Sequence, residues 1–482
     1  MFRLSLAIII ITVNSSFVNA QLNIQFEAED PYPVVVPGLL GHSGLTPVAD
    51  KLGRDYLYVT ANLLGLKIYE TSSGLNLIQT MDPSVLTDDA STVTQRDSLL
   101  YVGLGGIFGD TNVVGAMAIV DVADPTNPQL LDVWTDPNTN PGLASGVGVV
   151  RVQGDYAYLG EMAEGLTILN ISNPSAITFV SKLTPEIDFP HPNNDQKKVN
   201  ARGMEIVDTL LYLCYDAGGV RVINIADVFN PVQIGQFSNP VTILPPPTNW
   251  NLPRAYNNIL IEDTLAYVAV DYCGLEVWSV SDPTNALLLA HWNPVDCPLN
   301  GQWEQAPVHA NEMVLQSECN MLFVSTGKSE LMVLDIADPY APYAVDSFGT
   351  VLDTTGTWGL DVTDENIYLT YAYVVDLPIL PEAFFGDWGG IKKLTYDNCG
   401  LSLKEEGQTN IVIFPNPAES KVYVRGVPTD FNYELVDLTG QSIQAGEGKS
   451  DSAIDVSQCL SGVYFILIYT ENTVVQKKIS VH

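Results

Sequence analysis

The chain has 482 residues, and its 21 lysines and arginines stand against 56 aspartates and glutamates, which gives a formal net charge of −35 at pH 7. The length exceeds the roughly 250 to 300 residues at which a single hydrophobic core usually stops growing. Such acidity excludes nucleic acid and anionic membranes as partners, because binding their phosphates would release no counterions. The negative charge is compatible with divalent cations and with cationic or neutral ligands such as glycans. It is equally compatible with simple solubility in a saline habitat.

Residues 1–20 have the pattern of a secretory signal peptide. Arg3 is the one charged residue, an apolar run extends over 4–13, and a polar stretch ends at Ala20 before Gln21. The apolar run is too short to span a membrane, and no later segment reaches the roughly 18 apolar residues of a membrane helix. We therefore expect an exported chain whose mature form is soluble.

An internal repeat begins with a short segment centred on an aromatic residue. Its copies read DYLYVT at 55, SLLYVG at 98, DYAYLG at 155, TLLYLC at 209, TLAYVA at 264, NMLFVS at 320 and NIYLTY at 366. The aligned aromatic residues are Tyr58, Tyr101, Tyr158, Tyr212, Tyr267, Phe323 and Tyr368. They are about 43 to 57 residues apart, which is typical of β-propeller blades.

A second motif follows each aromatic segment after a Gly-containing loop. Clear copies are MAIVDVADPTNP at 117, LTILNISNPSA at 166, VRVINIADVFNP at 220, LEVWSVSDPTN at 275 and LMVLDIADPYAP at 331, with weaker ones at 66 and 391. The two motifs together resemble the LVIVD repeat family over about residues 40 to 400. The resemblance implies a seven-bladed β-propeller with four-stranded blades, which we assign to residues 21–400.

The residues favour the same all-β architecture without the family. Short segments rich in Val, Ile, Leu and Tyr alternate with Gly, Asn, Asp and Pro turns. In the fourth copy we expect an inner strand A over 204–207, B over 210–214, C over 220–225 and an outer D over 232–237. One such sheet buries its two faces only against neighbours on both sides. The Asp or Asn before each Pro is predicted to form the turn rather than to bind a metal.

The last eighty residues form a separate unit. We assign residues 401–410 to a polar linker and 411–482 to a small immunoglobulin-like β-sandwich. Its motifs resemble the type A sorting domain of type IX secretion. The residues that carry the resemblance are Pro415, Asn416 and Pro417, the turn from Asp437 to Gly440, and Gly462 and Tyr464 of SGVYF. The family implies recognition by an outer-membrane translocon in Bacteroidota-type bacteria, followed by release or attachment at the cell surface.

Propeller topology places the A–B and C–D turns on one face and the B–C and D–A connections on the other. Nearly all insertions belong to the second class, which we call the long-loop face: residues 104–114, 136–141, 185–199, 244–254, 293–307 and 371–388. Long loops on one side of a rigid scaffold predict a binding face. Trp250, Trp303 and Trp388 lie in these loops and suit a sugar ring or a protein hot spot, although they could equally fold the loops onto the scaffold.

The residues that open the inner strands are expected to ring the central channel on the long-loop face, and we call this ring the channel mouth. The repeat alignment places Asp89, Arg202, Asn257, His309, Asn311 and Trp358 there, with Glu205 and Asp361 deeper. Varied polar residues at equivalent positions suit a ligand-specific mouth, and a water-filled channel tolerates the same variety.

A loop calcium site and two disulfides are further possibilities. Asp188, Asn193, Asn194 and Asp195 supply the hard oxygen atoms that Ca²⁺ prefers. Six cysteines allow fifteen disulfide connectivities, and none forms the C-x-x-C pair of a zinc site. Cys273 and Cys297 fall on the long-loop face and Cys319 and Cys399 on the other, which predicts the pairs Cys273–Cys297 and Cys319–Cys399.

These observations predict a secreted, non-catalytic binding or adhesion scaffold that takes a glycan or a protein on the long-loop face. The alternative is a secreted propeller hydrolase or lyase. Propeller enzymes of that kind draw their carboxylates from separate blades, and in this alternative Glu205 and Asp361 serve as general acid and base with calcium as a cofactor.

Overall fold

The protein was analysed as a computed structural model. It describes residues 22–33, 43–106, 113–139, 145–190, 199–239, 256–294, 308–350, 355–373 and 386–397, followed by 412–414, 418, 420–425, 431–436, 442–449, 453–459, 462–469 and 474–481. The chain divides into two compact units, residues 1–398 and 399–482. The expected signal peptide and the linker at 401–410 lie outside the described residues.

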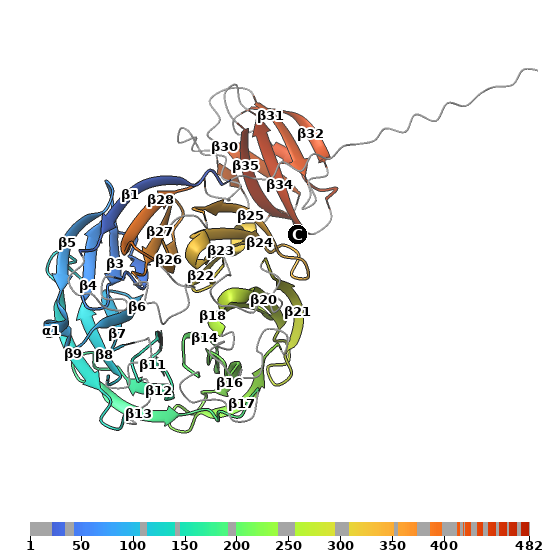
Figure 1. Cartoon of the computed structure of the whole chain (residues 1–482). Coiled ribbons are helices and arrows are strands. Elements are labelled where there is room, and N and C mark those ends of the chain that lie inside the picture. Colours follow the sequence, from blue (N-terminus) through green and yellow to red (C-terminus); the bar gives the residue numbers. More distant parts are fainter. Residues whose placement is uncertain are drawn as a thin grey trace, which may run out of the picture. The chain divides into compact units, whose positions relative to one another are not determined.

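The described residues of the first unit form seven four-stranded antiparallel sheets, each hydrogen-bonded from an inner to an outer strand. In Figure 1 they follow one another around a common axis, with β6, β14, β18, β22 and β26 toward the centre and β5, β9, β13, β17 and β21 at the rim. This arrangement is a β-propeller, as the repeat pattern predicts. We number the sheets as blades 1 to 7.

The strand bounds follow the repeat. Blade 1 contains β2 (Pro47–Ala49), β3 (Tyr56–Thr60), β4 (Leu66–Glu70) and β5 (Asn76–Met81); blade 2 contains β6 (Ala90–Arg96), β7 (Leu99–Leu104), β8 (Ala116–Asp121) and β9 (Gln129–Thr135); blade 3 contains β10 (Val149–Gln153), β11 (Tyr156–Glu161), β12 (Gly165–Asn170) and β13 (Thr178–Leu183). Blade 4 contains β14 (Gly203–Val207), β15 (Leu210–Cys214), β16 (Val220–Asn224) and β17 (Val232–Phe237). The strands expected for the fourth copy are thus present within one residue.

The remaining blades keep this order. Blade 5 contains β18 (Tyr256–Glu262), β19 (Leu265–Val270), β20 (Gly274–Ser279) and β21 (Leu287–Trp292); blade 6 contains β22 (Met313–Gln316), β23 (Met321–Ser325), β24 (Leu331–Asp335) and β25 (Tyr343–Phe348); blade 7 contains β26 (Thr357–Val362), β27 (Asn366–Tyr371) and β28 (Gly390–Thr395). One helical turn, α1 (Pro83–Leu86), and the 3-10 turns η2 (Asp271–Cys273), η4 (Ser317–Cys319) and η5 (Gly327–Ser329) lie in the connections. No described helix is long and apolar enough to cross a membrane.

The N-terminal strand closes the ring. β1 (Gln25–Pro31) pairs antiparallel with β28 and so becomes the outer strand of blade 7. The two ends of the propeller chain therefore share one sheet, which removes the open edge that a linear array of blades would leave. The weak last copy of the repeat is the blade that is completed in this way.

The aromatic residue of each repeat lies on the second strand of its blade and is buried. The seven side chains are at most 3 % exposed: Tyr58, Tyr101, Tyr158, Tyr212, Tyr267, Phe323 and Tyr368. Hydrophobic clusters connect neighbouring blades; for example, Ile68 of blade 1 packs in one cluster with Val102 and Val120 of blade 2. The hydrophobic core is thus divided into smaller cores between neighbouring blades. A chain of this length therefore needs no single large core.

The acidic residues before proline are turn formers, as expected. The carboxylates of Asp124, Asp282 and Asp338 accept the backbone N–H two residues later, at 3.0 Å in each case. Asp227 makes the same contact with the N–H of Phe229 at 3.0 Å. The C–D turns are therefore short and stabilised by their own side chains.

The second unit contains a three-stranded sheet of β29 (Val412–Phe414), β30 (Lys421–Arg425) and β33 (Ala453–Asp455) and a four-stranded sheet of β31 (Phe431–Val436), β32 (Ser442–Gly448), β34 (Gly462–Tyr469) and β35 (Val474–Val481). A core that includes Val422, Leu435 and Ile466 lies within it. Gly462 and Tyr464 pair with Val481 and Ile479 across β34 and β35. Pro415, Asn416, Pro417, Asp437 and Gly440 lie outside the described residues.

The cysteines fall into two groups. Cys273 and Cys319 are disulfide-bonded, whereas Cys214 and Cys459 are free thiols. The expected partners, Cys297 and Cys399, lie outside the described residues, and the connectivity stays a prediction.

Peptide mapping under non-reducing conditions tests that connectivity. We expect cross-linked peptides for Cys273–Cys297 and Cys319–Cys399, and we expect the loss of either bond by Cys→Ser replacement to destabilise the fold by about 2–4 kcal/mol. The matched control is Cys214→Ser, which removes a thiol without breaking a cross-link. A map in which Cys297 or Cys399 is a free thiol would contradict the assignment.

The closure of the ring provides a second prediction. A Cβ atom on Gly359 of β26 would lie 1.9 Å from the carbonyl oxygen of Leu45 in the segment that enters blade 1. Gly359→Ala should therefore lower the free energy of unfolding by about 1–3 kcal/mol. The control is Thr178→Ala on the exposed outer strand β13, with an expected change within about 0.5 kcal/mol. Thermal unfolding followed by circular dichroism gives both values, and equal midpoints for the two variants would disprove a tight closure.

Candidate functional site

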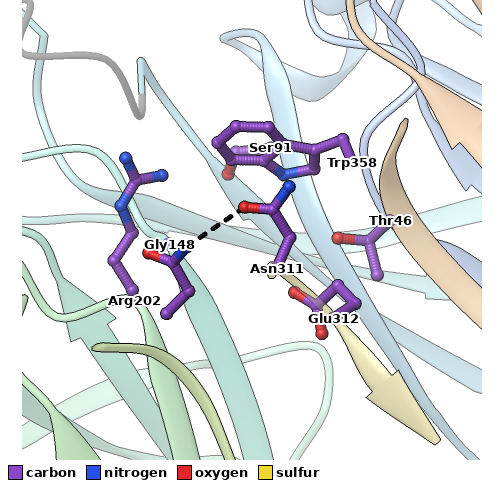
Figure 2. A pocket seen from close by; sticks show the side chains of 8 residues that line it. Thr46, Ser91, Gly148, Arg202, Asn311, Glu312 and Trp358 are labelled. Carbon is purple, nitrogen blue, oxygen red and sulfur yellow. Dashed lines mark hydrogen bonds between the residues drawn. The ribbon is translucent and has the colours of Figure 1, made fainter. Parts of the chain in front are cut away.

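A pocket at the channel mouth is lined by residues from all seven blades. Its residues are Thr46, Ser91, Gly148, Arg202, Asn257, Asn311, Glu312 and Trp358. Each lies within an inner strand or just before it, so the start of the inner strand in every blade supplies part of the pocket wall. Figure 2 shows Arg202, Asn311, Glu312 and Trp358 around this pocket. The predicted mouth residues Arg202, Asn257, Asn311 and Trp358 are thus brought together.

The mouth is narrow because glycines let the inner strands approach each other. A Cβ atom on Gly148 would lie 2.7 Å from the carbonyl oxygen of Ala201 in the next blade, and one on Gly203 would lie 2.5 Å from that of Asn257. The cavity left at the centre is about 20 Å³, which is room for about one water-sized group. A sugar ring does not fit inside it, so a larger ligand would have to lie above the mouth.

Polar side chains of the mouth connect blade 2 to blade 3, blade 5 to blade 6 and blade 6 to blade 7. Ser91 donates its hydroxyl to the carbonyl of Val147 at 2.6 Å. Asn257 donates to the carbonyl of Ala310 at 2.8 Å, and Asn311 donates to that of Thr357 at 3.2 Å. These hydrogen bonds hold the side chains around the channel mouth in defined positions. The side chains therefore lose less conformational entropy when a ligand binds.

Arg202 is the cation of the pocket, and it lies between an aromatic ring and a carboxylate. Its guanidinium carbon is 5.3 Å from the centre of the Trp358 ring, and its Nε is 3.7 Å from Oδ1 of Asp216. Asn200 donates its amide to Oδ2 of Asp216 at 2.8 Å. Burial raises the pKa of Asp216 to about 6; Arg202 and Asn200 oppose that shift, and Asp271 adds to it.

His309 and Asp271 form a second close pair beside this group. Nε2 of His309 lies 2.6 Å from Oδ1 of Asp271, and the centres of the His309 and Trp358 rings are 6.2 Å apart. Both Asp216 and Asp271 have positive φ, 44° and 23°. Asn62 and Met162 have positive φ at the corresponding turns of blades 1 and 3, so this conformation is a feature of the repeat. We call Asn200, Arg202, Asp216, Asp271, His309 and Trp358 the mouth cluster.

Deeper carboxylates are paired with cations or amides. Glu205 on β14 lies 3.8 Å from Nε of Arg151, and burial raises its pKa although Arg151 opposes the shift. Glu312 accepts a hydrogen bond from Asn258, and burial likewise raises its pKa. Two channel carboxyl groups therefore titrate above their ordinary range, and the sequence analysis had named only Glu205.

Asp361, the other half of the predicted acid–base pair, is held by two donors. Its Oδ2 accepts the backbone N–H of Ala49 at 2.7 Å and lies 3.2 Å from Nζ of Lys51. Glu205 belongs to blade 4 and Asp361 to blade 7, and each has a cationic partner of its own. A cationic partner stabilises the ionised carboxylate, which suits a general base better than a general acid.

Of the other predicted residues, Trp388 and Asp89 are described. Trp388 packs edge-on against Tyr371, with ring centres 4.9 Å apart. Nζ of Lys392 lies 5.4 Å from the centre of the Trp388 ring. Burial and the neighbouring Asp88 raise the pKa of Asp89 to about 6. Trp250 and Trp303 lie outside the described residues.

The proposed calcium loop is described only in part. Asp188 donates its backbone N–H to Glu186 at 2.6 Å, and Asn193, Asn194 and Asp195 lie outside the described residues. Within the described ranges no group of three His, Cys, Asp or Glu side chains is arranged to hold a metal ion. Calcium stays a prediction of the sequence.

Sequence reasoning missed Asp216, Asp271 and Glu312. A signal for the first two was present, because Asp stands directly after the second strand in both LCYDAGG and VAVDYCG. The alignment of the repeats followed the aliphatic strands and therefore did not compare the residues of the B–C turns. Glu312 was not predicted because it directly follows Asn311. Successive side chains of a strand normally point in opposite directions, so only one of the two was expected at the mouth.

Comparisons with known proteins agree with both units. Residues 145–184 and 319–350 match the LVIVD repeat family, and residues 412–482 match the secretion system C-terminal sorting domain. The chain therefore contains LVIVD repeats within a propeller and carries a type IX sorting domain, which indicates a secreted or cell-surface protein and implies interaction with the type IX secretion machinery. No curated protein sequence matches significantly.

Solved structures show likeness of fold at low identity. The WD40 repeats of RRP9 align with a TM-score of 0.52 and 11% identity, over 77% of this chain and 99% of that one. The computationally designed protein Ika8 aligns at 0.43 and 9%, over 77% of this chain and 99% of that one. PorZ, a surface component of the type IX secretion system of Porphyromonas gingivalis, aligns at 0.34 and 12%, over 89% of this chain and 64% of its own. The RRP9 alignment supports the propeller fold alone.

The raised pKa of Asp216 predicts how stability depends on pH. The folded state binds the proton more tightly than the unfolded chain, whose ordinary value is 3.8, so this carboxyl stabilises the fold below pH 4 and loses that effect as pH rises through about 6. Relative to wild type, Asp216→Asn should gain about 2–3 kcal/mol between pH 4 and pH 7. Unfolding midpoints measured across that range provide the test.

Asp227→Asn is the control for this experiment. Hydrogen bonds from Asn230 and Phe229 lower the pKa of Asp227, so its contribution is present above pH 4 and is lost as pH falls. Relative to wild type, Asp227→Asn should therefore show no slope between pH 4 and pH 7, and below pH 4 a slope opposite in sign to that of Asp216→Asn. A rise in stability of Asp227→Asn between pH 4 and pH 7 equal to that of Asp216→Asn would contradict the electrostatic interpretation of the mouth cluster.

Proposed function

We propose that this LVIVD-repeat propeller with a type IX sorting domain is a non-catalytic binding or adhesion scaffold that works outside the cell. It takes a glycan or a protein on the long-loop face, above the channel mouth. The C-terminal unit serves export through the type IX translocon, and the propeller carries the ligand site.

The observation that carries this proposal is the composition of the channel mouth. Five of the seven blades place polar side chains at the start of their inner strands, and hydrogen bonds between blades fix several of them. Trp358 adds an aromatic ring that is partly exposed. A fixed group of polar side chains beside one aromatic ring is typical of binding sites that select a ligand by its shape and hydrogen bonds.

Charge narrows the class of ligand. The net charge of −35 disfavours polyanions, and the mouth cluster adds Asp216 and Asp271 to this field. Neutral and cationic ligands are therefore favoured. A bound ligand would gain most of its contact area from the surface above the pocket, because the cavity itself holds about one water-sized group.

A secreted hydrolase or lyase is the alternative, and one observation favours it. Glu205 and Glu312 both have raised pKa values in the channel, as a general acid requires. Glu312 is the better candidate for the acid, because Glu205 pairs with Arg151 and Asp361 with Lys51. The enzyme hypothesis therefore rests on Glu205 with Glu312 more than on Glu205 with Asp361.

Binding screens on the purified secreted protein test the scaffold proposal. Glycan and protein arrays are probed with the wild type and with Trp358→Leu and Asn311→Ala, and we expect at least about tenfold weaker binding of the hit in both variants, or about 1.4 kcal/mol. Phe229→Ala is the control, because Phe229 is 65 % exposed on a C–D turn at the opposite end of the strands. Turnover of a bound glycan that disappears in Glu312→Gln would show the enzyme instead.

A further inference from the structure

The pocket at the channel mouth contains acceptors that the protein itself leaves unused. Oε2 of Glu312 accepts a hydrogen bond from Asn258, whereas Oε1 of Glu312 accepts none from a described residue. Nδ2 of Asn257 donates to the carbonyl of Ala310 and to Oδ1 of Asn311, and Oδ1 of Asn257 likewise accepts no hydrogen bond within the described ranges. Glu312 and Asn257 both line the pocket and are partly exposed. A ligand that carries hydrogen-bond donors therefore finds two acceptors in the pocket wall.

The charges at the pocket favour a neutral ligand. Arg202 places a guanidinium in the pocket wall, and its positive charge opposes a cation. Asp216 lies 3.7 Å from Nε of Arg202, and the whole chain carries a net charge of −35, so an anion is opposed as well. Burial raises the pKa of Glu312, so its carboxyl holds a proton more readily than an exposed one and attracts a cation less strongly. A hydroxyl group, which is a donor without charge, meets these conditions.

The size of the pocket limits the group that can enter. The cavity of about 20 Å³ holds about one water-sized group, and it is partly open to solvent rather than enclosed. A hydroxyl on a single methylene carbon is narrow enough for such a cavity. A hydroxyl attached directly to a sugar ring is not, because the neighbouring ring carbons would meet the pocket wall first.

The partly exposed wall of the pocket suits the rest of a sugar. Arg202, Asn257 and Trp358 come from blades 4, 5 and 7, line the pocket and are each partly exposed. The guanidinium of Arg202 donates hydrogen bonds, and Oδ1 of Asn257 accepts them. Sugar hydroxyls both donate and accept, so one ring can satisfy the two side chains together, while the indole of Trp358 adds apolar area beside them. A serine side chain also ends in a hydroxymethyl group, but the peptide backbone around it carries no further hydroxyls.

We propose that the pocket receives the hydroxymethyl group of a neutral hexopyranose unit of a glycan. The hydroxyl of that group donates to Oε1 of Glu312. The sugar ring stays above the mouth, where its own hydroxyls contact Asn257 and Arg202. The inference rests on the proposed binding function and makes it specific, because it assigns a glycan rather than a protein to the channel mouth and names the group that enters the pocket.

Titration of the full-length protein with simple glycosides tests this, with binding followed by ligand-observed NMR at pH 7.5. The probes are the methyl glycosides of glucose, galactose and mannose. Each is compared with the analogue in which the hydroxymethyl group is replaced by a methyl group. We expect at least one parent glycoside to bind at least about tenfold more tightly than its own analogue, because the analogue leaves the acceptor in the pocket unpaired.

Two variants locate the bound sugar. Glu312→Leu removes the acceptor in the pocket, so it should abolish the preference for the parent glycoside and leave the affinity for the analogue within about twofold. Asn257→Leu removes the acceptor for a ring hydroxyl, so it should weaken parent and analogue equally, by at least about threefold, and leave their ratio unchanged. Circular dichroism verifies that each variant is folded, and if one variant unfolds the other still decides.

Glu318→Leu is the matched control for Glu312→Leu. Glu318 is exposed in η4, which follows β22, whereas Glu312 directly precedes that strand. The two glutamates therefore lie at opposite ends of one inner strand. The control should change neither the affinities nor their ratio, and loss of the preference in both variants would overturn the inference.

The outcomes separate this inference from the function on which it rests. Equal affinity of every parent and its analogue, a preference that survives in Glu312→Leu, or unchanged affinities in Asn257→Leu would overturn the inference and leave glycan binding standing. Binding of an array glycan or protein, but of no glycoside, would overturn it and leave the scaffold function standing. Cleavage of a bound glycoside that is lost in Glu312→Gln would overturn both, because Glu312 would then act on the glycosidic bond.

Discussion

The pairing of β1 with β28 is the contact on which the rest of the propeller depends. It brings residues 25–31 and 390–395 into one sheet and so brings blade 7 against blade 1. At that boundary the hydroxyl of Thr370 donates to the carbonyl of Leu45, and Gly359 allows the two backbones to meet. Only a closed ring places seven inner strands around one axis, and only then do seven equivalent positions of the repeat form a single mouth.

The distribution of cations explains why the mouth is acidic. Several of the few basic residues form ion pairs between strands near the long-loop face. Lys182 is surrounded by Asp136, Glu161 and Glu164 at 2.5–2.9 Å, and Lys392 pairs with Glu330 at 3.1 Å. Buried pairs of this kind neutralise carboxylates that would otherwise destabilise the interior. The excess of acidic residues then stays on the surface and at the channel, where it can attract a cationic partner.

The C-terminal unit is a type IX sorting domain, and the proposed binding function belongs to the propeller. The C-terminal unit has its own core and its own two sheets. The propeller in turn supplies a rigid frame whose inner strands differ in a few side chains. Such a frame can acquire a new ligand through changes at the mouth positions while the buried aromatic residue of each repeat stays in place.

The sequence by itself determined the repeat, the strands and the turns, because these depend on neighbouring residues. The alternation around Tyr212, the spacing of the copies and the Asp before Pro are local patterns, and the inner-strand residues Arg202, Asn257, Asn311 and Trp358 followed from aligning them. Tertiary structure decided the rest. Gln25–Pro31 reads as a polar, acidic segment and becomes a strand because β28 offers an unpaired edge. Asn200, just before β14, donates to Asp216, just after β15, so this contact forms only when the strands of blade 4 pair and does not follow from a local pattern of the sequence.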